Sequence, residues 1–374
     1  MKIIELPFKV KKPILACGAD MKGAFALAKG SKAFLFEGFG DLGDPDNLAK
    51  YEKSVKRQIN ALKIDPEIAV CDLHPGYYST QFAEHYALSA KRYTLIKIQH
   101  HEAHVASAIV DNRIKDDVIG VAFDGTGYGT DGNIWGGEFF IGGLRQLERA
   151  AQFEYIPMPG AEAAIKEPWR MAVSYLYRTY GRKFLDLKID FIKRQDRKSM
   201  FRLISMIEKN INSPLTSSAG RLFDAVGSLV LLKDKAAFEA ELPIELEKMA
   251  IELCRDKYDL GIESKKGILN VSFSKTLRGI VKDLSLKTDL LTISGKFHNT
   301  IAEAISEVSV RLRKKYRISK VILSGGAFQN KFLTGRTVEL LKKQKFDVFT
   351  HLNVSTNDSG IPIGQIAIAR AKCV

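Results

Sequence analysis

Cysteine is scarce in this chain, and the few cysteines stand far apart. The 374 residues contain four of them and no CxxC pair; they are Cys17, Cys71, Cys254 and Cys373. This spacing argues against a zinc ribbon and against a disulfide framework. Cys17 and Cys71 lie in apolar segments, where we expect small buried thiols and not nucleophiles.

Long apolar runs are also missing. No uninterrupted apolar stretch approaches the roughly 18 residues that a membrane span needs. The N-terminal stretch MKIIELPFKVKKPILACGAD lacks the apolar core and the small-residue cleavage site of a signal peptide. We therefore expect a cytoplasmic protein that has no membrane partner.

Basic residues outnumber acidic ones, and the formal net charge is +14. Such a balance attracts anionic ligands, acidic proteins or nucleic acid. The basic residues are spread along the chain, with local clusters at 193–198 and 311–317, and no RNA-binding motif with interleaved aromatics is present. A solvated surface is the favoured explanation, an acidic protein partner comes second, and nucleic acid is the least favoured.

Apolar runs alternate with helical patterns in both halves, which predicts an α/β fold with a partly parallel sheet. Each half opens with two apolar runs around a glycine-containing turn, at residues 12–38 and 118–144. This repetition predicts a duplicated fold with a cleft between two lobes. We expect a first lobe at 1–117 and a second at 118–374, with a largely helical insertion at about 162–297.

Three of the seven histidines lie within the stretch HHEAH. His100 and His104 have i,i+4 spacing, which puts both imidazoles on one face of a helix, as a metal site requires. The stretch is not the HExxH motif of zinc proteases, because Val105 stands where the second histidine would be. An incidental pair of histidines is the alternative.

Two carboxylates are the best candidates to complete such a site. Asp124 and Asp358 each follow a predicted strand, and carboxylates at the carboxyl ends of strands line the crevice of open α/β sheets. A set of two histidines and two aspartates is mixed nitrogen and oxygen ligation, which suits Fe(II), Zn(II) or Mn(II). Capping of loops by the aspartates is the alternative.

A glycine-rich stretch, DGTGYGTDG, begins at Asp124. Glycine lets the backbone approach an anion closely and point several N–H groups at it. The stretch is neither a GxGxxG motif nor a P-loop, since a second strand follows it. Its candidate nucleotide contacts are Gly125, Thr126, Gly127 and Gly129, and a purely structural hairpin is the alternative.

Other stretches also suit an anion. Gly325 and Gly326 follow a predicted strand and precede a helix, which is a suitable position for a nucleotide phosphate. Lys22 lies in the first glycine turn. In SSAGRLFDAV, Arg221 suits an anion and Asp224 a ribose diol, whereas a helix cap with an i,i+3 ion pair is the structural alternative.

Several long motifs occur in order along the chain. They are LACGADMKGAFAL, GDL, CDLHPGYYST, QHHEAH, AFDGTGYGTDGNIWGGEF, EPWRMA, SSAGRLFDAV, KFHNTIAEA, LSGGAFQN and TNDSGIPIGQIAIA. Together they resemble the carboxy-terminal carbamoyltransferase domain of HypF over nearly the whole length. The O-carbamoyltransferases of antibiotic biosynthesis and the TsaD enzymes of tRNA modification are more distantly similar.

The resemblance implies a duplicated actin/Hsp70/sugar-kinase-like fold, in agreement with the repeated hairpin. It implies that His100, His104, Asp124 and Asp358 bind a divalent transition metal, Fe or Zn. It also implies an adenine nucleotide (carbamoyl-adenylate, AMP or ATP) between DGTGYGTDG and the SGG turn, with Asp224 on its ribose and Asn330 among its contacts.

The implied reaction moves a carbamoyl group from carbamoyl-adenylate to the C-terminal cysteine of a HypE-like acceptor, in the synthesis of the cyanide ligands of NiFe-hydrogenase. HypF proteins make the adenylate in a YrdC-like part, which this sequence lacks, so we expect a separate YrdC-like or HypF-like polypeptide to supply it. O-carbamoylation of a small molecule, a TsaD-like tRNA reaction and a non-catalytic nucleotide-binding partner are the alternatives.

Overall fold

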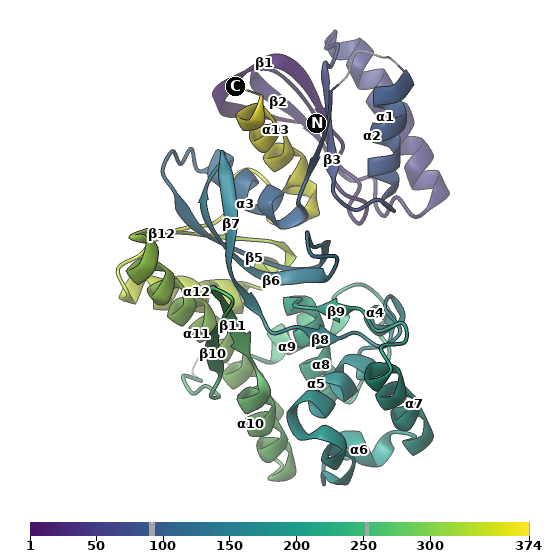
Figure 1. The fold of residues 1–374 in the computed structure, drawn as a ribbon, viewed down its shortest axis with the longest axis vertical. Helices are drawn as coiled ribbons and strands as arrows, with labels where there is room; N and C mark the ends of the chain where they lie inside the picture. Colours follow the sequence, from purple (N-terminus) through teal and green to yellow (C-terminus); the bar gives the residue numbers. More distant parts are fainter. Residues whose placement is uncertain (90–93, 251–253, 374) are drawn as a thin grey trace.

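The computed structural model describes residues 1–89, 94–250 and 254–373 as two β-sheets with helices around them. The parts of the predicted lobes and insertion that fall on residues 90–93, 251–253 and 374 lie outside the described residues. Figure 1 shows the first sheet at the top, the second in the middle, and most of the inserted helices below.

The first sheet has the strand order β2-β1-β3-β4. Its strands are β1 (Lys2–Ala16), β2 (Phe25–Phe36), β3 (Ile68–Asp72) and β4 (Thr94–Ile98). β1 and β2 form an antiparallel hairpin, whereas β3 runs parallel to β1 and β4 runs parallel to β3. Parallel neighbours need crossover connections, and the helices α1 (Pro45–Leu62) and α2 (Tyr78–Ser89) supply them.

The second sheet has the order β10-β11-β7-β6-β5-β12-β13. The strands of this order are β5 (Val118–Tyr128), β6 (Ile134–Gly143), β7 (Gln146–Phe153), β10 (Gly261–Lys265), β11 (Ile268–Ser272), β12 (Lys320–Ser324) and β13 (Asp347–Phe349). Two short strands, β8 (Ile156–Pro157) and β9 (Leu215–Thr216), pair with each other, and β9 also pairs with β6. β5, β6 and β7 are antiparallel, and β12 and β13 continue the sheet in parallel from β5. Helices α11 (Leu290–Tyr316) and α12 (Lys331–Lys343) precede these last two strands.

The two sheets therefore repeat one topology, an antiparallel hairpin that is extended by parallel strands with helical connections. The expected duplicated α/β fold is confirmed. The inserted region is mainly helical, but β10 and β11 within it add an edge to the second sheet. The helices of this region are α4 (Ala163–Lys166), α5 (Trp169–Tyr180), α6 (Asp190–Arg194), α7 (Arg197–Glu208), α8 (Ala219–Leu231), α9 (Glu241–Met249) and α10 (Ser274–Ser285).

Two helices tie the sheets together. α3 (His100–Asp111) follows β4 of the first sheet but packs on β5, β6 and β12 of the second. α13 (Ile361–Lys372) ends the described chain but packs on β1, β2, β3 and β4. The two helices also cross each other between the sheets, as Figure 1 shows. The division into lobes at residue 117 stays a prediction, and both α3 and α13 pack across it.

Helix α3 is buried on nearly all sides, which explains its composition. Ala103, Ala106 and Val110 pack with α13 and the first sheet, while Val105 and Ile109 pack against the second sheet. A helix that is covered all round can carry apolar residues all round. Its polar side chains, the histidines included, are therefore in the interior of the molecule.

No helix among the described residues combines the length and the apolar character that crossing a membrane requires.

The crossing of α3 and α13 is very close at Gly364. A Cβ at this position would overlap the carbonyl oxygen of Ala103. We predict that Gly364→Ala lowers the free energy of unfolding by about 1–3 kcal/mol, because one of the helices must shift. Gly335 in α12 is the matched control, since a Cβ there would meet nothing within 4 Å.

Urea unfolding of both variants tests this packing. Gly335→Ala should raise the free energy of unfolding by about 0.4–1 kcal/mol, because alanine restricts the unfolded chain. If the two substitutions change stability equally, the close crossing of α3 and α13 is not a constraint on the fold.

Candidate metal and nucleotide site

Helix α3 begins at a well-formed cap next to the second sheet. The side-chain oxygen of Gln99 accepts hydrogen bonds from the backbone N–H groups of His101 (2.7 Å) and Glu102 (2.9 Å). The amide nitrogen of Gln99 donates to the carbonyl oxygen of Tyr128 in β5 (3.0 Å). This cap fixes the first turn of α3, and with it His100, against the glycine-rich end of β5.

Four predicted ligands meet at one point of the interior. We call His100, His104, Asp124 and Asp358 the donor cluster; each offers a ligand atom, and these atoms lie within 4.8 Å of one another. The Nε2 atoms of His100 and His104 lie 3.2 and 3.3 Å from Oδ2 of Asp124. They lie 3.7 and 3.5 Å from Oδ1 of Asp358. The i,i+4 spacing thus does place both imidazoles on one face of α3.

The chain brings these residues together from three elements. The histidines come from the first two turns of α3, and Asp358 begins the 3-10 helix η3 (Asp358–Gly360) that leads into α13. Asp124 lies within β5, which runs on to Tyr128 and does not end at the aspartate as the sequence predicted. Its pairing with β6 is irregular between Phe123 and Gly127, and such an irregularity redirects a side chain.

A fifth buried residue orients the cluster. Nδ1 of His100 lies 2.8 Å from Oδ2 of Asp72, whose side chain is fully buried at the end of β3. A carboxylate on the remote nitrogen selects the tautomer that leaves Nε2 free to act as a ligand. Sequence reasoning missed Asp72. Its signal was a carboxylate at the carboxyl end of a strand that neighbours β4, the strand before α3.

The electrostatics of the cluster favour the ionised carboxylates. Burial alone would raise the pKa of Asp124, but its hydrogen bond to His100 and its close contact with His104 outweigh this and hold the pKa well below the usual range. The pKa of Asp358 is lowered by the same histidines, against burial and the charge of Asp124. Burial lowers the pKa of both histidines, and their contacts with the aspartates raise it further than burial lowers it. Two buried negative charges thus require positive charge between them.

His104 shows whether the cluster suits a cation. Although Nε2 is close to both aspartates, neither ring nitrogen of His104 has a well-directed hydrogen-bond partner among the described residues. A buried imidazole without a partner costs free energy unless a ligand satisfies it. Two imidazole nitrogens and two carboxylate oxygens that converge are a suitable donor set for a divalent transition metal. The residues present therefore fit a metal ion.

The predicted glycine stretches surround Asp124. Its other oxygen, Oδ1, accepts a 3.3 Å hydrogen bond from the backbone N–H of Gly326 in the SGG turn. Gly220, at the start of α8, packs against Gly125. A Cβ at Gly220 would lie 2.8 Å from the Cα atom of Gly125. The hydroxyl of Ser218 lies 2.9 and 2.6 Å from the carbonyl oxygens of Asp124 and Gly125.

Within DGTGYGTDG the glycines have different surroundings. Gly125 and Thr126 are partly exposed, and a Cβ at Gly125 would meet nothing within 4 Å. A Cβ at Gly127 would overlap the ring of His101, and one at Gly129 would overlap the ring of Trp135. Gly127 and Gly129 are thus required for packing, while Gly125 leaves open space over the backbone.

Other predicted nucleotide contacts already have partners. Nζ of Lys22 lies 2.6 Å from Oε2 of Glu239, which joins the first glycine turn to the inserted region. Arg221 and Asp224 form the i,i+3 ion pair at 2.7 Å, and Ser218 caps α8; these are the contacts of the local alternative, while a role of either residue in nucleotide binding stays a prediction.

The SGG turn has its own local supports. Gly325 has a φ of 101°, and a Cβ there would overlap the carbonyl oxygen of Phe123, so this position requires glycine. Asn330 caps α12 by accepting a 2.8 Å hydrogen bond from the N–H of Leu333. Its amide nitrogen lies 3.0 Å from Nε2 of His298. The turn thus rests on β5 on one side and on α11 on the other.

Further supports were not evident in the sequence. The carboxylate of Asp111, at the end of α3, accepts hydrogen bonds from the backbone of residues 352–354, in the loop that leads to Asp358. The buried Glu138 binds the N–H groups of Gly136 and Gly137, the hydroxyl of Ser217 and Arg149. Both carboxylates hold loops whose positions depend on partners far away in the sequence.

Comparison with protein families assigns the chain. Residues 9–111 match the family described as HypF Kae1-like domain, and residues 120–365 match the family described as Carbamoyltransferase, Kae1-like Domain, second subdomain. The chain belongs to the HypF family. The sequence-based resemblance is thereby confirmed, and it covers nearly all residues.

Relatives within the HypF family agree with this assignment. The Carbamoyltransferase HypF of a Synechocystis strain is 33% identical over 97% of this chain and 48% of its own length. A Carbamoyltransferase HypF homolog of Cupriavidus necator is 30% identical over 96% of this chain and 91% of its own length. A crystal structure of full-length HypF in the phosphate- and nucleotide-bound form has 35% identity and a TM-score of 0.92, covering 99% of this chain and 57% of that one. The chain thus spans about half of the Synechocystis protein.

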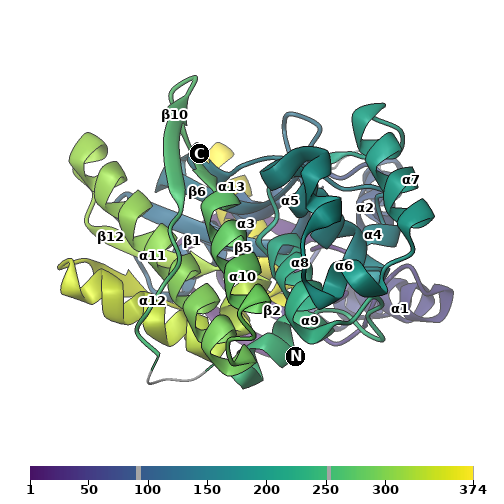
Figure 2. The ribbon, with the colours of Figure 1, turned by 90° about the horizontal axis from the view of Figure 1, so that it is seen from below.

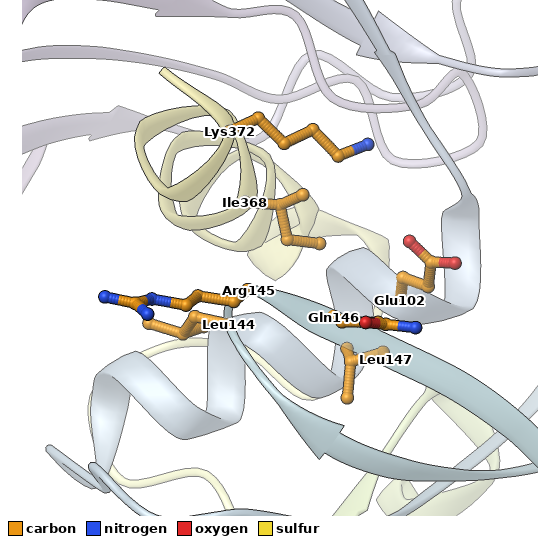
Figure 3. A pocket seen from close by; sticks show the side chains of 7 residues that line it. All are labelled: Glu102, Leu144, Arg145, Gln146, Leu147, Ile368 and Lys372. Atoms are coloured by element: carbon orange, nitrogen blue, oxygen red, sulfur yellow. The ribbon is translucent and has the colours of Figure 1, made fainter. Parts of the chain in front are cut away.

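A small cavity lies on the opposite face of α3 from His100 and His104. It has a volume of about 180 Å³, and Figure 3 shows Glu102 of α3 and Lys372 of α13 on its wall, with Arg145 pointing away. Burial raises the pKa of Glu102, and the charge of Lys372 opposes this. The cavity is lined by residues of α3, α13 and the β6–β7 turn, and none of the donor cluster lines it.

His298 provides a pH test of the wall beside Asn330. Its Nδ1 donates to the carbonyl oxygen of Ser294 (2.9 Å), and burial lowers the pKa of His298 to about 4. An unfolded histidine takes up its proton near pH 6.5, so folding is penalised as the pH falls from 6.5 towards 4. We predict that this residue costs about 2 kcal/mol of stability between pH 7 and pH 5.

The comparison is with His298→Gln, in urea unfolding at pH 5, 6 and 7. At pH 7 the variant should have a lower free energy of unfolding than the unchanged protein. Between pH 7 and pH 5, however, its free energy of unfolding should fall by about 2 kcal/mol less. His351, whose pKa burial also lowers to about 4, is present in both proteins and cancels. Equal losses would show that His298 is not held neutral.

Proposed function

We propose that this chain transfers a carbamoyl group from carbamoyl-adenylate to the C-terminal cysteine thiol of a HypE-like protein. The observation that carries the proposal is the donor cluster, in which two histidines and two aspartates converge beside two glycine turns. Membership of the HypF family supports the choice of the carbamoyl group. The acceptor and the donor compound are our inference from that family.

In this proposal His100, His104, Asp124 and Asp358 hold a divalent transition metal, Fe or Zn. The metal would act as a Lewis acid that polarises an oxygen of the bound substrate. Asp72 keeps the ring of His100 oriented, and Gly326 holds the second oxygen of Asp124. These contacts hold His100 and Asp124 in place before the substrate binds.

The nucleotide would lie between the DGTGYGTDG stretch and the SGG turn, next to Asp124. The open backbone at Gly125 and Thr126 and the N–H of Gly326 are our candidates for its phosphate, with Gly127, Gly129 and Gly325 shaping the turns. Asp224 and Asn330 are our candidates for the nucleoside. Arg221 and Lys22 would meet anionic groups once their pairs with Asp224 and Glu239 open.

The transfer step balances without a protein nucleophile. The acceptor thiolate forms a C–S bond to the carbamoyl carbon, the C–O bond to the phosphate breaks, and the electron pair leaves with AMP. The buried thiols of this chain do not suit the attack, because burial raises the pKa of Cys71 to about 12 and that of Cys17 further. We assign the attacking sulfur to the acceptor, which this chain would position.

The carbamoyl-adenylate would be made by another polypeptide. We assign its supply to a YrdC-like or HypF-like polypeptide, because the residues described here match the Kae1-like part of HypF relatives. The role of this chain would then be to bind the adenylate, exclude water and present the carbamoyl group to the thiolate.

The experiment incubates the metal-loaded chain with carbamoyl-adenylate and a HypE-like protein, and then measures the mass of the acceptor. We predict a gain of one carbamoyl group, with Asp124→Asn reducing the rate by at least about a hundredfold, since it weakens a metal ligand that also contacts the SGG turn. Acceptor whose C-terminal cysteine is changed to serine is the control and should gain nothing.

Other outcomes separate the alternatives. Carbamoylation of a small-molecule hydroxyl, or modification of tRNA, without any gain on the HypE-like protein would reject the proposed acceptor. Binding of adenylate with no transfer to any acceptor would indicate a nucleotide-binding partner without catalytic activity.

A further inference from the structure

A larger cavity lies in the inserted region, away from the donor cluster. Its volume is about 440 Å³, and its walls are α10, α11 and the segment before β10. Figure 2 shows α10 and α11 side by side, and Figure 1 shows α10 near the bottom of the molecule, well separated from α3. We call this cavity the α10 pocket. Its size is in the range of small-molecule sites.

The floor of the α10 pocket is a hydrogen-bonded unit of three side chains. Asp283 accepts hydrogen bonds from the hydroxyl of Tyr258 (2.8 Å) and from Nζ of Lys296 (2.6 Å). The ammonium group of Lys296 also lies 4.4 Å from the centre of the Tyr258 ring. Tyr258 fits only because residue 279 is glycine, where a Cβ would overlap its ring. Two carboxylates line the α10 pocket, Asp259 and Asp283, and Lys296 neutralises Asp283.

Three cations stand on the wall above the floor. Lys275, Arg278 and Lys282 have the spacing i, i+3 and i+7, so they share one face of α10. None of the three forms an ion pair with a carboxylate in the described parts of the chain, whereas Lys257 on the opposite wall pairs with Glu303 at 2.7 Å. Arg278 has one long hydrogen bond, 3.4 Å, to the carbonyl oxygen of Thr179, and its guanidinium carbon lies 6.0 Å from the centre of the Tyr180 ring. Most of their N–H donors are free for a ligand.

We propose that the α10 pocket is a second anion site, which binds a small compound with two or more phosphate groups. Three unpaired cations on one wall supply more positive charge than a single phosphate needs, and several N–H donors match the acceptor oxygens of adjacent phosphates. The neutralised Asp283 does not repel such a ligand, and the three cations of α10 outnumber the second lining carboxylate, Asp259. The concave shape selects a compact anion over a nucleic acid strand, which would need an extended basic surface.

Calorimetric titration of the full chain with inorganic pyrophosphate tests the site, at low and at physiological salt. Lys282→Glu reverses a charge within the α10 pocket, and Lys198→Glu on α7 is the matched reversal outside it. We expect Lys282→Glu to weaken this binding event by roughly tenfold or more, because it removes a charge-assisted hydrogen bond. Lys198→Glu should change the affinity less than twofold.

Pyrophosphate can also bind at the proposed carbamoyl-transfer site, so a second measurement must distinguish the two sites. In the otherwise unchanged chain, Asp124→Asn should leave pyrophosphate binding in the α10 pocket unchanged. Lys282→Glu should leave the rate of carbamoyl transfer at saturating substrate unchanged. Equal weakening by Lys282→Glu and Lys198→Glu would indicate non-specific attraction and overturn the proposal. Binding of tRNA or of an acidic peptide in this pocket without any binding of pyrophosphate would overturn it as well.

Discussion

The crossing of α3 and α13 is the constraint on which the rest of the structure depends. Each helix follows one lobe in the chain and packs on the sheet of the other, and the two come into backbone contact at Gly364 and Ala103. Because of this exchange, histidines that follow the first sheet lie beside Asp124 of the second. Asp358, at the start of the segment leading into α13, closes the cluster from the other side. The site is therefore a product of the duplicated fold and not of any one lobe.

The charged groups of this site are buried, so they need partners of opposite charge. Asp72, Asp124 and Asp358 all lie in the interior with His100, and isolated carboxylates there would be costly. His100 offsets part of this cost by hydrogen bonding, whereas the ring nitrogens of His104 have no well-directed partner among the described residues. A divalent cation would satisfy both carboxylates and both imidazoles at once. This is why we regard the cluster as a metal site and not as a buried ion-pair network.

The sequence allowed the fold class, the family and the four donors to be predicted, because these follow from periodicity, motif order and i,i+4 spacing. It did not reveal Asp72 or Asp111, whose roles depend on neighbours that only the folded chain brings close. The strands β10 and β11 were also missed, since they are short and partly exposed. For Arg221 and Asp224 the local alternative, an i,i+3 pair in a capped helix, describes their contacts in the structure.

The central claim is that the donor cluster binds one metal ion, and elemental analysis of the purified chain tests it most directly. The unchanged protein and His85→Ala, which alters an exposed histidine on α2, should each carry about one transition-metal ion per chain. His104→Ala should lose most of the metal while staying folded. Equal metal content in all three proteins, or none in any of them after growth with iron and zinc, would contradict the account.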